Sequence, residues 1–270
     1  MQKRVVLITG GSSGIGRALA FSFGRAGARI AFTGRTEKSL LRVGQELSAA
    51  GIDNLPLVAD VAVRADNERV VQAVIERYGQ LDILINNAGI TMRSLFADAD
   101  PDVLRTVMDT NFFGTVYATH YALPHVRRAK GSIVGISSIA GFRGLPVRSG
   151  YSASKFAMNG FLEALRTELL HDGVHVLTAC PGFTTSNIRF TALGKNGQVT
   201  GDTVRDEAAM MPAEEVADRI LTATRQRKRT LILTTQGRLT VFLNKWLPGF
   251  MDKLVYNTLA KEKDSPLKKG

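Results

Sequence analysis

The clearest indication of the fold in this chain of 270 residues is the segment Val5-Val6-Leu7-Ile8-Thr9-Gly10-Gly11-Ser12-Ser13-Gly14-Ile15-Gly16. Its first part, Val5 to Thr9, joins β-branched and aliphatic residues without polar alternation, which predicts a strand buried on both faces. From Ile15 onward apolar residues recur at helical spacing, at Leu19 and Phe23. A buried strand, a glycine-rich turn and a helix in this order predict the start of a doubly wound α/β domain.

The alternation of a short apolar run and an amphipathic stretch continues along most of the chain. Further strands are expected at 30–33, 55–58, 81–86, 132–137, 174–179 and 230–234. Helices are expected at 15–26, 37–50, 63–78, 102–128, 151–171 and 212–225. Strands that alternate with helices pair in parallel through right-handed crossovers, so the pattern predicts a single-domain, Rossmann-type parallel sheet covered on both faces.

Two segments interrupt this alternation. Residues 187–211 are polar and rich in glycine, which indicates an excursion that acts as a substrate lid. Residues 237–262 combine apolar residues at helical spacing with lysines. We therefore expect a catalytic domain over 1–236 and an amphipathic helical extension with a basic tail over 237–270.

Composition narrows the class of protein. Hydrophobic residues make up 44% of the chain and charged residues 22%, as in an ordered globular protein. Cys180 is the only cysteine, strand-like residues begin at Arg4, and no run of 18 apolar residues occurs. These features predict a cytoplasmic protein without a membrane span.

The formal net charge of +11 is concentrated in two places. The run Arg225-Gln226-Arg227-Lys228-Arg229 holds four basic residues, and residues 238–270 hold seven against three acidic ones. Basic surface of this kind is solvated in most proteins, and in others it binds anionic lipid or nucleic acid. The expectation is a solvated or membrane-facing surface and no nucleic acid.

The glycine-rich turn predicts a dinucleotide site. It follows the first strand and opens the first helix, so its backbone can approach a pyrophosphate placed at the helix N-terminus. Its spacing differs from the Gly-x-Gly-x-x-Gly fingerprint, but the strand-turn-helix context is the required one. The residues expected to touch the cofactor here are Gly10, Ser12, Ser13, Gly14, Ile15 and Gly16.

The end of the second strand favours NADP(H) over NAD(H). NAD-binding folds usually have an acidic residue here, which binds the ribose 2′-hydroxyl. This chain has Arg35 instead, whose guanidinium suits a 2′-phosphate. Glu37 is close by, but it is better explained as a favourable charge in the first turn of the next helix. Ser13 supplies no second positive charge at this place.

The segment Tyr151-Ser152-Ala153-Ser154-Lys155 places a tyrosine and a lysine on one helix face. An ammonium near the phenol would favour ionisation and yield an acid/base group usable near neutral pH. Ser138 ends an apolar strand and Asn87 follows another, so both fall at the carboxyl edge of the sheet, where ligands bind. Strand alternation turns Ser137 to the opposite face, which predicts a structural role for it.

Taken together, these motifs resemble those of the short-chain dehydrogenases/reductases. They are Thr-Gly-x-x-x-Gly-x-Gly from Thr9, Asn86-Asn87-Ala88-Gly89, Asn111, Ser138, Tyr151-x-x-x-Lys155 and Pro181-Gly182. The resemblance covers residues 4 to about 235. It implies that Tyr151 is the general acid/base, Lys155 lowers its pKa and binds the nicotinamide ribose, Ser138 polarises the substrate oxygen and Asn111 anchors a relay water.

The resemblance also implies further cofactor contacts. Asp60 and Val61 would bound the adenine, and Asn87, Ala88 and Gly89 would lie beside the adenosine ribose. The nicotinamide would be held by Pro181, Gly182, Phe183, Thr184 and Ser186, with Tyr151 and Lys155 touching its ribose. Ser186 stands where the family usually has threonine, so Thr184 or Thr185 is an alternative source of that hydroxyl.

No metal is expected. His171 and His175 are separated by Gly173 and a turn, and His120 and His125 face different directions on a helix. The side chains expected near the substrate are mostly apolar, which favours a hydrophobic carbonyl compound, although several would equally suit packing of the lid. They are Met92, Ile139, Phe142, Leu145, Phe183, Phe190, Met210 and Met211.

The extension resembles that of lipid- and steroid-directed short-chain reductases, in particular the branch of dehydrogenase/reductase family member seven. Its apolar residues beside lysines fit an interfacial helix, a helix packed on the core, or a contact with another subunit. The family implies a homodimer or homotetramer joined through helices 102–128 and 151–171. The leading hypothesis is an NADP(H)-dependent oxidoreductase acting on a carbonyl or secondary alcohol; the alternative is a non-catalytic dinucleotide sensor or scaffold.

Overall fold

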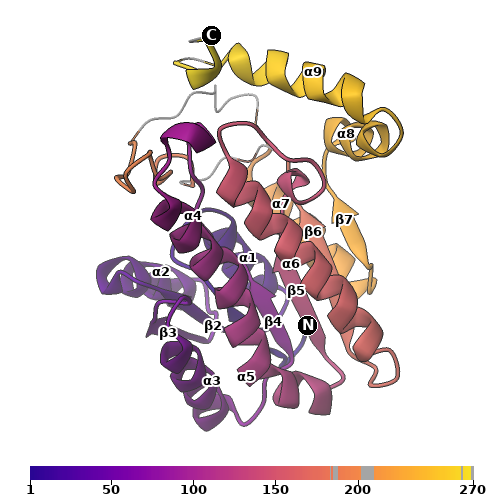
Figure 1. The fold of residues 1–270 in the computed structure, drawn as a ribbon. Coiled ribbons are helices and arrows are strands. Elements are labelled where there is room, and N and C mark those ends of the chain that lie inside the picture. Colours follow the sequence, from indigo (N-terminus) through magenta and orange to yellow (C-terminus); the bar gives the residue numbers. More distant parts are fainter. Residues whose placement is uncertain (183, 185–187, 202–209, 263, 269–270) are drawn as a thin grey trace.

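A seven-stranded parallel sheet forms the centre of the molecule (Figure 1). The structure is a computed structural model that describes residues 1–182, 184, 188–201, 210–262 and 264–268. The strand order is β3-β2-β1-β4-β5-β6-β7, so the order reverses between β1 and β4. The strands are β1 (Val5–Ile8), β2 (Arg29–Gly34), β3 (Asn54–Val58), β4 (Ile83–Asn86), β5 (Ser132–Ile136), β6 (His175–Cys180) and β7 (Thr230–Ile232).

Alternate residues of each strand enter two separate cores. Val6 and Ile8 of β1 pack with α1 (Gly14–Arg25), α2 (Glu37–Ala49) and α7 (Ala213–Arg225). Val5 and Leu7 face the other side, which is covered by α3 (Arg64–Tyr78), α5 (Gly114–Arg128) and α6 (Ser149–Glu168). Because side chains of a strand alternate between faces, a continuous apolar run produces a sheet buried on both sides, as predicted.

The expected helix 102–128 is three elements. α4 (Pro101–Met108) is followed by a π-helical turn (Asp109–Phe113) and then by α5. Asp100 caps α4 by accepting a hydrogen bond from the backbone N–H of Asp102. The local sequence is helical throughout, and the widened turn appears only because Asn111 is held by contacts from elsewhere in the chain.

The C-terminal extension consists of two helices, α8 (Thr235–Trp246) and α9 (Pro248–Ala260). The turn between them places Pro248 at the first position of α9, where proline needs no backbone donor. Short 3₁₀ turns occur at Phe96–Asp98, Ile139–Gly141 and Pro266–Lys268. No helix in the described part of the chain is long and apolar enough to cross a membrane.

Residues 188–201, which form most of the described part of the predicted lid, lie against the segment that follows β4; residues 210 and 211 are also described. The N–H of Arg93 donates to Leu193 O at 2.8 Å, and the N–H of Leu193 donates to Thr91 O at 2.9 Å. The N–H of Asp100 donates to Lys195 O at 2.9 Å. These bonds bring the excursion to the carboxyl edge of the sheet; residues 187 and 202–209 of the predicted lid lie outside the described residues.

Candidate active site

Ser138 and Tyr151 meet at the carboxyl end of β5. Ser138 lies two residues after the end of that strand. It caps a short 3₁₀ turn, where its Oγ accepts a hydrogen bond from the N–H of Ala140 at 3.1 Å. Tyr151 lies in the first turn of α6, and the Ser138 side chain is close enough to its hydroxyl to lower the pKa of the phenol. Two groups able to hold one substrate oxygen are therefore side by side.

Lys155 lies one helical turn after Tyr151 and is almost completely buried. Its Nζ donates to Ile136 O at 2.9 Å and lies 5.8 Å from the centre of the Tyr151 ring. Burial penalises the ammonium and lowers the pKa of Lys155 to about 8. The shared helix face predicted for the two residues is confirmed.

The protonation of Tyr151 differs from the expectation. Burial raises the pKa of Tyr151, and the nearby Ser138 hydroxyl opposes this increase. Lys155 is not the dominant influence because its ammonium is itself desolvated and donates to a backbone carbonyl. In this structure the phenol is therefore stabilised in its protonated form.

Asn111 ties the site together from a fully buried position in the π-helical turn. Its Oδ1 accepts from the N–H of Ile90 at 2.8 Å, and its Nδ2 donates to Ile90 O and to Ser154 Oγ, each at 2.9 Å. Ser154 Oγ in turn donates to Tyr151 O at 2.7 Å. Asn111 thus fixes the backbone after β4 to α6.

Gly89 lies close to both Asn111 and Lys155. A Cβ at this position would lie 3.2 Å from Asn111 Oδ1 and 3.6 Å from Lys155 Nζ. The predicted grouping of these residues at one edge of the sheet is therefore present. Ile90 and Ser154 were missed by the sequence analysis, although Ser154 falls inside the Tyr151-x-x-x-Lys155 segment.

The glycine-rich turn leaves the N-terminus of α1 open. Gly10 and Gly14 have positive φ angles of 67° and 50°, which favour glycine. Ser13 is the N-cap of α1, yet no side chain among the described residues caps this helix. The N–H groups of its first turn are thus free to bind a pyrophosphate, so the residues present fit a dinucleotide.

Asn87 and Thr9 stabilise this turn through hydrogen bonds. Asn87 Nδ2 donates to Thr9 O at 3.0 Å and to Gly10 O at 2.9 Å. Thr9 Oγ1 accepts from the N–H groups of Asn87 and Ala88 at 3.0 and 3.1 Å. Asn87 therefore positions the glycine-rich turn with its side chain. Sequence reasoning missed the Thr9 contact, for which the β1–β4 strand order was needed.

Ala88 and Gly16 are in close contact with the same turn. A Cβ at Gly10 would lie 2.8 Å from Ala88 Cα, and one at Gly16 would overlap Gly10 O. Gly16 thus lets α1 lie directly against the end of β1. Ile15 and Ser12 are partly exposed at the mouth of the turn.

Arg35 follows β2, the neighbour of β1, and Asp60 and Val61 follow β3, which lies on the far side of β2. Arg35 is exposed, and no acidic partner for it is found among the described residues. Asp60 Oδ1 accepts from the N–H of Ala62 at 2.9 Å, which orders the turn after β3. Val61 is buried and touches the position where a Cβ of Gly114 would lie, 2.8 Å away.

The segment after β6 is described in part. Pro181 is buried, and a Cβ at Gly182 would lie 2.7 Å from Thr234 Cγ2, so glycine permits β6 and the start of α8 to approach closely. Thr184 Oγ1 donates to Gly182 O at 3.3 Å, which directs this hydroxyl back onto its own turn. Phe183, Thr185 and Ser186, which were predicted near the nicotinamide, lie outside the described residues.

Several neighbouring predictions are also tested by contacts. Ser137 Oγ donates to Asn159 Oδ1 at 2.6 Å, which confirms its structural role. Met92 is fully buried and packs with Val103 and Tyr151, which favours packing, the alternative given for it above. Ile139 and Phe142 are partly exposed immediately after Ser138.

The histidines show no metal-binding arrangement in the described ranges, where no group of three His, Cys, Asp or Glu side chains could hold an ion. His175 Nε2 lies 2.7 Å from Lys228 O and its Nδ1 lies 3.2 Å from Ser132 Oγ. Burial lowers the pKa of His175, which favours the neutral ring. The imidazole is thus a satisfied internal group.

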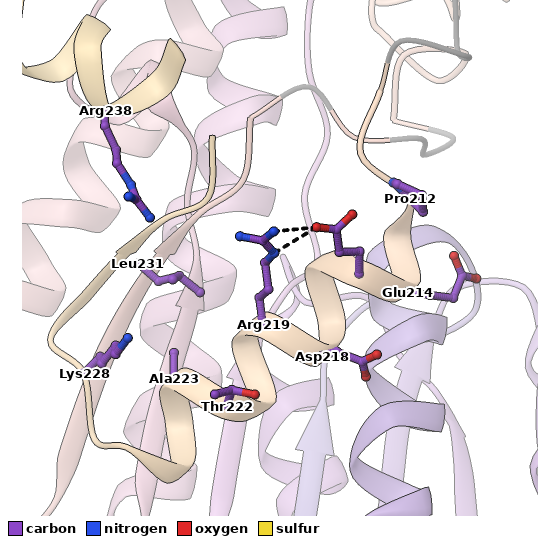
Figure 2. A pocket seen from close by; sticks show the side chains of 10 residues that line it. Pro212, Glu214, Asp218, Arg219, Thr222, Ala223, Lys228, Leu231 and Arg238 are labelled. Atoms are coloured by element: carbon purple, nitrogen blue, oxygen red, sulfur yellow. Dashed lines mark hydrogen bonds and ion pairs between the residues drawn. The ribbon is translucent and has the colours of Figure 1, made fainter. Parts of the chain in front are cut away.

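A surface hollow of about 600 Å³ lies between α7, β7 and the start of α8 (Figure 2). Figure 2 shows Arg219 bonded to a neighbouring acid, and this ion pair joins Arg219 Nη2 to Glu215 Oε1 at 2.6 Å. Lys228 and Arg238 approach from the other side. None of the residues predicted to bind cofactor or substrate lines this hollow, so it is separate from the candidate active site.

Comparison with known proteins identifies the family. The sequence pattern of the short chain dehydrogenases matches residues 4–194, which is more than half of the chain. The chain belongs to the short-chain dehydrogenase/reductase family. Within it, dehydrogenase/reductase SDR family member 7B of Bos taurus is 34% identical over 273 residues, covering 98% of this chain and 84% of that protein. The chain is therefore similar to the family member seven branch.

Two solved structures have the same fold. A short chain dehydrogenase/reductase from Burkholderia phymatum in complex with NAD has a TM-score of 0.83 and 23% identity, covering 92% of this chain and 95% of its own. An alcohol dehydrogenase from Thermococcus sibiricus complexed with 5-hydroxy-NADP has a TM-score of 0.76 and 21% identity, covering 86% and 96%. At these identities the likeness concerns the fold alone.

Proposed function

We propose that this protein transfers a hydride between NADP(H) and a hydrophobic carbonyl compound or the matching secondary alcohol. The observation that supports this most is the grouping of the Tyr151 hydroxyl with the Ser138 side chain, with the Lys155 ammonium one helical turn away. The open N-terminus of α1 lies on the same edge of the sheet. A bound nicotinamide supplies the hydride in reduction and accepts it in oxidation.

In reduction, Tyr151 is the proton donor to the substrate oxygen. The raised pKa of Tyr151 keeps the phenol protonated near neutral pH, as a general acid requires. The Ser138 hydroxyl holds the same oxygen and stabilises the charge that develops on it. In oxidation the same two groups act in reverse, and Tyr151 must lose its proton first.

Lys155 and Asn111 prepare the site for this proton transfer. The Lys155 ammonium stabilises the phenolate left after Tyr151 donates, since opposite charges at short range favour the ionised form. The proposed relay water would be anchored near Asn111. The contacts of Asn111 with Ile90 and Ser154 support this role by fixing the backbone around the site.

The proposed cofactor preference rests on Arg35. This guanidinium is exposed at the end of β2, which lies beside β1 and the glycine-rich turn and three positions from β5 in the strand order. The family uses either nucleotide, and an arginine at this position favours a 2′-phosphate. The proposal of an apolar substrate rests on Ile139 and Phe142, which are partly exposed beside Ser138.

The decisive test is Tyr151→Phe, with NADPH consumption measured against a panel of ketones, aldehydes, oxoacyl thioesters and steroids. Loss of the proton donor is expected to lower turnover by about 10²- to 10⁴-fold. NADPH affinity is expected to remain. Tyr117→Phe, which removes a hydroxyl from α5 away from the site, is the matched control.

Two results would contradict this function. Near-full activity of Tyr151→Phe would refute the acid/base role. Tight NADPH binding by the wild-type protein with no turnover of any compound class would favour the alternative, a dinucleotide sensor or scaffold.

A further inference from the structure

The two C-terminal helices present large apolar side chains to solvent. Trp246 is 65% exposed, Phe242 62% and Phe250 56%. Together with their neighbours they form what we term the α8–α9 apolar face, which comprises Leu239, Phe242, Trp246, Leu247, Phe250 and Leu254. Single exposed apolar residues need no explanation, but a cluster of aromatic and aliphatic residues indicates a binding surface.

The spacing of these residues places them together. On α8, Leu239, Phe242 and Trp246 follow the i, i+3, i+7 pattern of one helix face. On α9, Phe250 and Leu254 are one turn apart. The turn between the helices is exposed at every position from Lys245 to Phe250, so both apolar stripes meet at a projecting corner. Figure 1 shows α9 lying across one end of the molecule, with α8 joining it to β7.

The charges around this face are positive. Arg238, Lys245, Lys253 and Lys261 are exposed on or directly after the two helices. Of the three acids in residues 238–270, Asp252 and Glu262 are paired with arginines outside the extension, whereas Asp264 is exposed. Asp252 accepts from Arg143, and the buried Glu262 accepts from Arg148 at 3.2 Å. The exposed surface of the extension therefore carries a net positive charge.

The helices are firmly attached to the segment between Ser138 and Tyr151. Arg143 Nη1 donates to Asn244 Oδ1 at 3.0 Å, and Asn244 Nδ2 donates to Phe142 O at 3.1 Å. Gly237 lies so close to Ile139 that an added Cβ would be 2.7 Å from its Cδ1. The α8–α9 apolar face is thus a rigid platform beside the substrate-binding segment.

We propose that the α8–α9 apolar face docks onto a membrane surface that contains anionic lipid. Aromatic and aliphatic side chains at a projecting corner suit the boundary between headgroups and acyl chains, and flanking lysines suit anionic headgroups. A second copy of the chain would bring the same lysines together, which disfavours a symmetric contact. Docking would orient the segment between Ser138 and Tyr151 towards the lipid. This inference does not depend on the reaction proposed above.

The only tryptophan of the chain, Trp246, makes the test direct. The full chain would be mixed with vesicles of phosphatidylcholine alone or of equal parts phosphatidylcholine and phosphatidylserine. Co-sedimentation and a blue shift of Trp246 emission are expected with the anionic vesicles. Absence of both signals would overturn the proposal.

Three variants separate the apolar and charged contributions. Leu247→Glu with Phe250→Glu is expected to weaken binding to anionic vesicles at least about tenfold. Lys245→Gln with Lys253→Gln is expected to weaken it about 30-fold, because each surface lysine contributes about 1 kcal/mol. Phe96→Glu, at an apolar residue that is 72% exposed outside the extension, is the matched control and should bind like wild type.

Unfolding midpoints of all variants would be compared with wild type, and solution mass would be measured without lipid. Equal weakening by Phe96→Glu would refute a specific face. A different result would be that the wild type does not bind vesicles and that Leu247→Glu with Phe250→Glu lowers the solution mass. The α8–α9 apolar face would then be a contact between copies of the chain, and the proposal would be wrong.

Discussion

Burial favours the uncharged forms of both Tyr151 and Lys155. Burial raises the pKa of Tyr151 and lowers the pKa of Lys155 to about 8, because both charged forms lose hydration. Lys155 nevertheless remains mostly protonated at neutral pH. The pair therefore holds one proton on the phenol and a nearby positive charge, which are the conditions for acid catalysis.

Lys155 has a measurable consequence for stability. Its pKa is 10.5 in an unfolded chain and about 8 in the fold, so the unfolded state binds more protons between these values and the free energy of unfolding rises with pH. Relative to Lys155→Met, wild type is expected to gain about 2 to 3 kcal/mol from pH 8 to pH 10.5. Urea denaturation at both pH values measures this, with Lys38→Met as the exposed control. Parallel pH profiles for wild type and Lys155→Met would contradict the assigned pKa.

Arg35 provides the residue-level test of cofactor preference. Arg35→Asp replaces the cation proposed for the 2′-phosphate with an acid suited to a ribose hydroxyl. The ratio of NADPH to NADH affinity is expected to fall about 10- to 100-fold, as for loss of a charge-assisted hydrogen bond of about 1.5–3 kcal/mol. Fluorescence titration with each nucleotide gives the ratio, and an exposed arginine elsewhere, Arg42→Asp, controls for net charge. An unchanged ratio would leave Arg35 without this role.

At the scale of elements, the turn between β1 and α1 shows why glycine is needed. Gly10 and Gly51 have similar positive φ angles of 67° and 71°, so alanine is strained at both. They differ in space: a Cβ at Gly10 would contact Ala88, whereas nothing lies within 4 Å at Gly51. Comparing the two separates backbone conformation from close approach.

We expect Gly51→Ala to lower the free energy of unfolding by about 1 kcal/mol and Gly10→Ala by about 3 kcal/mol, because overpacking adds to the conformational cost. Gly10→Ala is also expected to weaken NADPH binding, since Ala88 and the phosphate-binding turn must move apart. Urea denaturation and nucleotide titration measure the two effects. Equal destabilisation by both substitutions would show that the Ala88 contact costs nothing.

The elements also show the limits of local sequence patterns. The strand-helix order was predicted correctly because buried strands and amphipathic helices have distinct periods. The stretch 102–128 was predicted as one helix because its local sequence is helical, whereas the π-helical turn at Asn111 depends on Ile90 and Ser154. The turn at Pro248 divides the predicted extension into two helices.

At the scale of the whole molecule, two exposed aromatic residues bear on assembly. Phe113 in the π-helical turn and Phe156 on α6 are 39% and 45% exposed, and both belong to the helices that the family resemblance assigns to the dimer surface. We propose a homodimer or homotetramer in which these side chains are buried.

Light scattering is expected to give a mass two or four times the 29.3 kDa of one chain. Phe156→Glu is expected to lower that mass, because a buried carboxylate in an apolar interface is costly. Leu41→Glu, at a residue of α2 that is 50% exposed, should leave it unchanged. A monomeric mass for wild type at micromolar concentration would refute the assembly.

The order of strands and helices, the position of the glycine-rich turn and the pairing of Tyr151 with Lys155 can all be predicted from local sequence. Each of these is encoded within a few neighbouring residues, through periodicity, glycine placement or helical spacing. Three contacts are visible only in the folded chain: Asn87 supports the turn at Gly10, Asn111 is bonded to Ile90 and Ser154, and Arg143 attaches the C-terminal helices. These contacts join residues far apart in the chain, so no local pattern could specify them before the sheet order was known.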